Sequence, residues 1–139
     1  MKKQAIGLLL VMFALLSGSA AANASRSFTL QDFAGRWGGV ASGTILGGPF
    51  AANYILTINR DGTGRFLLDS SVGRVDASCT VTVESVGFGL ATCVDLNGPF
   101  AGVQSQTRLL LTDNMDKITV WVSVPEVGFF VTGTSHKMK

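Results

Sequence analysis

Two cysteines have the most readily predicted chemistry in this chain of 139 residues. Cys79 and Cys93 bracket a segment in which polar and apolar residues alternate, and residues 85–87 in its middle are typical of a three-residue hairpin loop. With that loop, the two cysteines lie directly opposite each other on antiparallel strands, where a disulfide can form. We therefore predict a disulfide; two buried free thiols are the alternative.

No other residues have the spacing of a catalytic or metal centre. His136 is the only histidine, so one chain cannot form a histidine triad or a multi-histidine metal site. The acidic residues fall mainly in turns, and no spacing brings two of them into one cleft, as a paired-carboxylate hydrolase requires. Residues 113–116 lack the ligand spacing of a calcium-binding loop. We predict no catalytic residue, no metal site and no cofactor.

An apolar pocket is the binding site that the alternation favours. In residues 50–59 every second side chain is apolar or aromatic, and Tyr54 adds one phenolic hydroxyl to that face. If the face turns inward, it lines a pocket together with apolar residues of later segments. The predicted lining residues are Tyr54, Leu56, Phe66, Leu68, Val103, Leu109, Val120 and Val122. The alternative is that the same side chains fill a solid core.

The first 24 residues have the composition of a signal peptide. Lys2 and Lys3 precede an apolar run over residues 5–16, and Ala22-Asn23-Ala24 fits a cleavage site. The run is too short for a membrane-spanning helix of about 20 residues. We expect a bacterial protein exported to the periplasm or secreted, with residues 25–139 as one domain and no membrane span once the signal is removed. An uncleaved anchor is the alternative.

The charge pattern excludes several classes of partner. Loss of Lys2 and Lys3 with the signal would remove two of the 11 basic residues and leave nine, equal to the nine acidic residues. No basic cluster remains that would bind nucleic acid or an anionic membrane. The two cysteines both lie in the exported part, where an oxidising compartment favours their pairing.

Eight segments have the period-two alternation of strands, after a short helical turn in which Thr29 and Asp32 are spaced for capping. Short turns join them, so they form an antiparallel meander, and closing the first strand onto the last removes both exposed edges. We predict an all-β, eight-stranded up-and-down barrel, with a two-sheet β-sandwich as the alternative. The expected strands are residues 37–45, 50–59, 63–69, 75–84, 88–95, 101–111, 117–124 and 129–136.

The opening Phe28-x4-Phe33-x-Gly35-x-Trp37 resembles the first motif of the lipocalins and their calycin relatives. This resemblance implies that Trp37 plugs one end of the barrel, with a basic residue of the last strand over its ring. Lys137 or His136 has the right position for that cation–π contact. A tryptophan in an ordinary β core is the alternative. Avidins share Gly-x-Trp, but Trp121 is the only other tryptophan, and biotin binding is not expected.

The chain is also similar to a loose group of small exported bacterial proteins of unassigned function. The shared features are Gly47-Gly48-Pro49, Asp61-Gly62-Thr63-Gly64 and Val131-Thr132-Gly133-Thr134. This resemblance implies a fold and no activity.

The resulting hypothesis is an exported, non-enzymatic β-barrel that binds a small apolar ligand or a protein partner. One alternative is a filled structural barrel that makes surface contacts through Trp121, Phe130 or Phe88. Another is a barrel-type cyclase with a pocket at Tyr54. The sequence names no ligand or partner and leaves the oligomeric state open.

Overall fold

The computed structural model describes residues 26–98, 100–112 and 114–139. The predicted signal peptide lies outside these residues.

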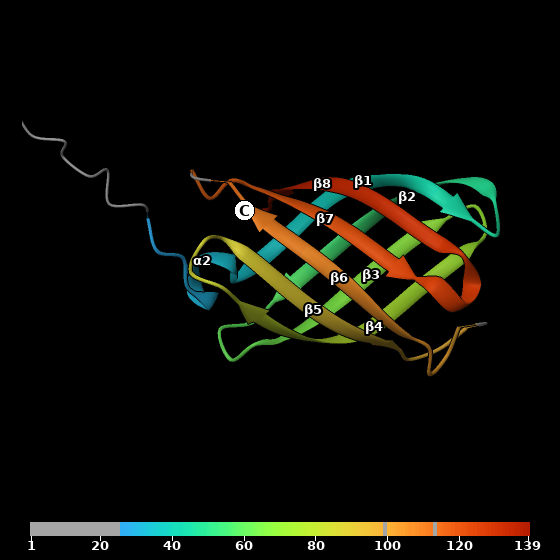
Figure 1. Ribbon diagram of the computed structural model, residues 1–139, viewed down its shortest axis with the longest axis horizontal. Coiled ribbons are helices and arrows are strands. Elements are labelled where there is room, and N and C mark those ends of the chain that lie inside the picture. The colour runs from blue at the N-terminus through green and yellow to red at the C-terminus, as the bar shows by residue number, and fades with distance from the viewer. Residues whose placement is uncertain (1–25, 99, 113) are drawn as a thin grey trace, which may run out of the picture.

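The described chain forms a closed barrel of eight antiparallel strands, in which each strand pairs with the next and the last pairs with the first (Figure 1). The barrel predicted from the sequence is therefore confirmed, and the sandwich alternative is wrong. The only α-helix among the described residues is a single turn before the first strand. The elements are α2 (Leu30–Phe33), β1 (Gly35–Ile45), β2 (Gly48–Ile58), β3 (Thr63–Ser70), β4 (Gly73–Val83), β5 (Phe88–Asp95), β6 (Gln104–Leu111), β7 (Lys117–Val124), the 3₁₀ turn η1 (Pro125–Val127) and β8 (Phe129–Lys137).

Three strands begin earlier than the alternation predicted. β1 begins at Gly35 and not at Trp37, because Gly35 and Arg36 already pair with the end of β2. β2 begins at Gly48 because the turn before it needs only Leu46 and Gly47, which both have positive φ (49° and 79°) as the tightest hairpin turns require. β4 begins at Gly73 because β3 continues to Ser70 and leaves a two-residue connection.

One strand begins later than predicted. The segment before β6 folds back on the end of β5, where the Gly102 amide donates to the Asp95 carbonyl (2.8 Å) and the Asp95 amide donates to the Val103 carbonyl (3.1 Å). Residues 101–103 are therefore part of a turn, and β6 begins at Gln104.

Glycines allow the first and last strands to pack closely. The β1–β8 pairing runs from Trp37 opposite Lys137 to Thr44 opposite Phe130. A Cβ atom added at Gly39 would lie 2.2 Å from the carbonyl oxygen of Thr134, a separation that real side chains do not reach. The closure therefore depends on the missing side chain at this position.

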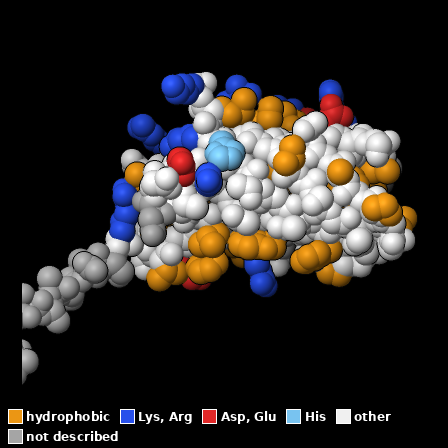
Figure 2. Space-filling view, turned by 90° about the horizontal axis from the view of Figure 1, so that it is seen from above, with side chains coloured by type: hydrophobic (Ala, Val, Ile, Leu, Met, Phe, Trp, Pro, Cys, Tyr) orange, Lys and Arg blue, Asp and Glu red, His pale blue; other side chains and the backbone are white. Residues whose placement is uncertain are grey.

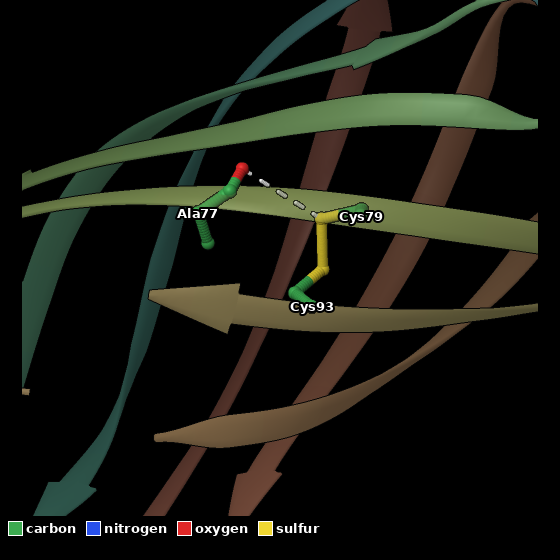
Figure 3. Close-up of a disulfide and its surroundings, with 3 residues drawn as sticks. All are labelled: Ala77, Cys79 and Cys93. Atoms are coloured by element: carbon green, nitrogen blue, oxygen red, sulfur yellow. Dashed lines mark hydrogen bonds between the residues drawn. A yellow bond between two sulfur atoms is a disulfide. The ribbon is translucent and has the colours of Figure 1, made fainter. Parts of the chain in front are cut away.

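The β4–β5 hairpin has the predicted register, with Cys79 opposite Cys93 and Val81 opposite Ala91. The two cysteines form a disulfide with an S–S distance of 2.05 Å, which confirms that prediction (Figure 3). Both are buried on the inner face of the barrel wall. Sγ of Cys79 lies 4.0 Å from the Ala77 carbonyl oxygen; a disulfide sulfur carries no proton, so this is a van der Waals contact.

The two ends of the barrel differ. At one end, α2 and the β2–β3, β4–β5 and β6–β7 turns cover the interior; we call this the closed end (Figure 1). At the other end lie the β1–β2, β3–β4 and β5–β6 connections and η1; we call this the open end. Fully buried side chains fill the interior behind the closed end, namely Phe33, Trp37, Leu56, Ile58, Leu109, Ile118 and Val120.

Candidate functional site: the open end of the barrel

The closed end is sealed by Trp37. Its side chain is 0% exposed, and Nε1 donates a hydrogen bond to the Phe33 carbonyl oxygen (2.8 Å). The Lys137 ammonium lies 5.2 Å from the Trp37 ring centroid, a cation–π distance. His136, one residue earlier on β8, is exposed and is paired with Gly38. Lys137, not His136, is therefore the basic residue over the ring, and the buried Trp37 side chain fills this end of the barrel.

A capping interaction at the start of α2 stabilises this turn, which covers the closed end. The Thr29 amide donates to Oδ2 of Asp32 (2.7 Å), and this hydrogen bond lowers the pKa of the Asp32 carboxyl. The turn points Phe33 into the barrel, where its ring packs near Gly89 on β5.

A cavity of about 60 Å³ lies inside the open end. Phe66, Leu68 and Val122 form its inner part and are buried. Phe100 from the β5–β6 connection and Phe129 at the start of β8 line it nearer the rim, where both are partly exposed. The lining is mostly apolar, as in small-molecule sites.

The predicted pocket residues divide into two groups. Phe66, Leu68, Val103 and Val122 line the open-end cavity. The other four, Tyr54, Leu56, Leu109 and Val120, lie in the packed core at 2% exposure or less and do not line it. The cavity is therefore nearer the open end than a pocket at Tyr54 would be.

The ring of Tyr54 occupies the space that would otherwise extend this cavity. Its centroid lies 5.6 Å from that of Phe66, and Cε1 lies 2.9 Å from where a Cβ of Gly133 would be. Burial raises the pKa of the Tyr54 hydroxyl. The nearby Ser135 hydroxyl is directed to the Ile118 carbonyl (3.2 Å), and Tyr54 Oη has no hydrogen-bond partner within the described residues.

Asp95 and Ser105 are polar side chains on the wall of the cavity that the sequence reasoning missed. Asp95 is two positions after Cys93, so it shares the inward face of β5. The alternation of β5 does place Asp95 on the inward face, but a carboxylate at the end of a strand is usually solvated. Here the β5–β6 connection folds back and shields it.

The environment of Asp95 disfavours its charge. Oδ1 is buried and has no hydrogen-bond partner in the part of the chain that the structure describes. Burial, and secondarily the nearby Asp76 carboxylate, raises the pKa of Asp95 to about 6. Arg65 does not compensate, because its guanidinium donates to Asp76 (Nε to Oδ1, 2.8 Å) and lowers the pKa of that carboxyl instead.

The raised pKa of Asp95 predicts that stability falls as pH rises. The folded state binds this proton more tightly than the unfolded state, whose pKa is near 3.8. Between pH 5 and 7.5 we expect the free energy of unfolding to decrease by about 1 kcal/mol, after allowance for partial exposure. Urea unfolding at the two pH values measures this. Asp32, Asp61 and Asp76 have lowered pKa values, so these carboxyls titrate below pH 4 and do not contribute to the change between pH 5 and 7.5.

Asp95→Asn should remove most of this difference and raise the stability at pH 7.5. Glu126→Gln is the control, since Glu126 is exposed in η1 at the same end of the barrel. A wild-type protein equally stable at both pH values, or an Asp95→Asn variant with an unchanged pH dependence, would contradict the assignment.

A second feature lies on the outer wall formed by β5 to β8. Phe88, Arg108, Trp121 and Phe130 line a shallow groove there, and Phe88 and Phe130 are 47% and 55% exposed. Figure 2 shows the molecule from above the view of Figure 1, and on that face hydrophobic side chains lie scattered among polar ones. The structure thus brings the three predicted surface aromatics onto one face.

The described residues include no group of three histidine, cysteine or acidic side chains that could hold a metal ion. None of the described helices has the length and apolar character needed to cross a membrane.

The fold and the site together define a closed eight-stranded β-barrel that is packed at one end and has a small cavity at the other. A solved structure described as "De novo design of a fluorescence-activating beta barrel" is similar to it, with a TM-score of 0.55 and 17% sequence identity over 78% of this chain and 96% of that one. At that identity the likeness concerns the fold. No family model and no curated protein matches the sequence.

Proposed function

We propose that this protein is an exported, non-enzymatic barrel that binds a small apolar ligand in the open-end cavity. The observation that carries the proposal is the mostly apolar cavity of about 60 Å³ above an otherwise packed interior. The space holds several atoms, since one water needs about 10–15 Å³ measured in this way. It is smaller than the cavity of about 150 Å³ that encloses benzene in another protein. A short aliphatic chain is therefore the best fit.

Export is part of the proposal. The disulfide of Cys79 and Cys93 and the signal-like residues 1–24 both favour an oxidising compartment outside the cytoplasm.

Titration with 1-butanol, followed by two-dimensional NMR of the labelled protein, tests the binding site. We expect saturable shifts for residues at the open end and none at the closed end. Ala77→Leu should abolish them, because Ala77 is buried and lines the cavity, so a larger side chain fills it. Ala51→Leu, on the exposed face of β2, is the matched control and should bind like the wild type. Absence of saturable shifts, or unchanged binding by Ala77→Leu, would overturn the proposal.

Binding of a protein partner is the second candidate, favoured by the groove with Phe88, Trp121 and Phe130. Exposed aromatic side chains on one face are typical of contact surfaces. The cyclase alternative receives less support, because Tyr54 does not line the cavity.

A further inference from the structure

The wall of the open-end cavity includes one acidic side chain, Asp95, among mostly apolar ones. Asp95 projects from the inner face of β5 into an apolar lining, and its Oδ1 is buried. A buried carboxylate oxygen without a donor is costly, and folded proteins usually satisfy such an atom. At neutral pH a group with this pKa is mostly ionised. Among the described residues, none that lines the cavity offers this carboxylate a positively charged hydrogen-bond donor.

The neighbouring strands do not supply that donor. On β3, Arg65 is engaged by Asp76, and Arg74 on β4 lies 3.1 Å from Asp69 in an exposed ion pair. On the other side, β6 and the turn before it contribute the uncharged hydroxyl of Ser105 and the side chain of Val103 to the cavity wall. A molecule that enters from the open end can therefore donate a hydrogen bond to the Asp95 carboxylate.

The rest of the lining suits the other parts of such a molecule. Phe66, Phe100 and Phe129 contribute three phenyl rings, whose faces attract a cation as well as an alkyl group. Asp95 is only partly buried as a residue, so a charged group beside it stays near the rim and keeps some of its water. The apolar part would extend inward toward Phe66 and Val122, which are buried.

From this arrangement we infer that the open-end cavity selects short aliphatic amines in their ammonium form, with the ammonium group donating to Asp95 and the alkyl chain in the apolar interior. The inference rests on the proposed function, since it assigns a ligand class to the same cavity. It assigns Asp95 the role of specificity determinant. A carboxylate ligand of the same length is disfavoured by like charge.

Three ligands of equal chain length test the inference at pH 7.5: butylammonium, 1-butanol and butyrate. NMR titration of the wild type should give butylammonium a dissociation constant about tenfold lower than that of 1-butanol, because hydrogen bonds between charged groups are the stronger kind. Butyrate should bind more weakly than both. In Asp95→Asn the preference for butylammonium should disappear, while 1-butanol still binds.

The outcomes separate the two proposals. If 1-butanol fails to bind the wild type, the cavity is not a ligand site and the proposed function falls. If 1-butanol binds but butylammonium binds no better, or if Asp95→Asn keeps the preference, the amine assignment alone is wrong. Tighter binding of butyrate would also overturn it, because the carboxyl would then act as a protonated donor. The wild-type comparison decides the matter even if the variant folds poorly.

Discussion

Trp37→Ala is expected to lower the free energy of unfolding by about 3–5 kcal/mol, the usual loss for removing a large buried aromatic side chain. Trp37 is fully buried at the closed end. The substitution leaves a cavity beneath α2, deprives the Phe33 carbonyl of its donor and removes the ring under Lys137. Domains of this size have only about 5–15 kcal/mol of stability. Urea unfolding followed by circular dichroism measures the loss.

Trp121→Ala is the matched control for this prediction. Trp121 lies on the outer wall of β7 and is partly exposed, so its loss should cost about 1 kcal/mol or less. Lys137→Met separates the cation–π contact from the packing and should cost about 0.5–1 kcal/mol. Equal losses for the two tryptophan variants would show that Trp37 does not hold the closed end.

The double variant Cys79→Ala, Cys93→Ala should lose about 3 kcal/mol, the figure for a cross-link that closes a loop of roughly 15 residues. The two cysteines are separated by 14 positions, and the two strands that carry them are paired from Ala77 to Val83. Those pairs keep the register without the cross-link, so the barrel should still form. The loss then arises mainly because the unfolded chain gains freedom.

Urea unfolding of the double variant and of the wild type measures this loss. Far-ultraviolet circular dichroism in buffer should be the same for both. Wild-type protein unfolded with a reductant should match the double variant, whereas reductant without denaturant should act slowly, since both sulfurs are buried inside the wall. Equal unfolding midpoints for variant and wild type would show that the disulfide does not stabilise the fold.

The β4–β5 hairpin and the closure of the barrel could be predicted from the sequence. They follow from the period-two alternation of the strands and from the lengths of the strands and loops. With the loop fixed at residues 85–87, only one register places Cys79 opposite Cys93, and that register is observed. Closure follows from eight short strands that would otherwise leave two open edges. The start of β6 could not be predicted, because the hydrogen bonds between residues 102–103 and Asp95 interrupt an alternation that continues in the sequence.

The position of the cavity depends on how side chains pack along the barrel axis. The alternation of a strand indicates only whether a side chain points inward or outward. Alternation correctly turns Tyr54 inward, yet its ring lies over Gly133 and fills the middle of the barrel. The same pattern could have placed Asp95 inward, because it follows Cys93 by two positions. Its shielding by the β5–β6 connection is a tertiary effect, so the polar part of the site is visible only in the folded structure.

The pairing of Trp37 with Lys137 joins positions one hundred residues apart. A chain synthesised from its amino end can build each hairpin as it emerges, since those contacts are local, but the closed barrel needs β8, the last strand described. Until then β1 has an unpaired edge, and loop-closure entropy opposes the final step most strongly. A partly synthesised chain therefore presents an open sheet edge, and that edge can pair with another copy of the chain.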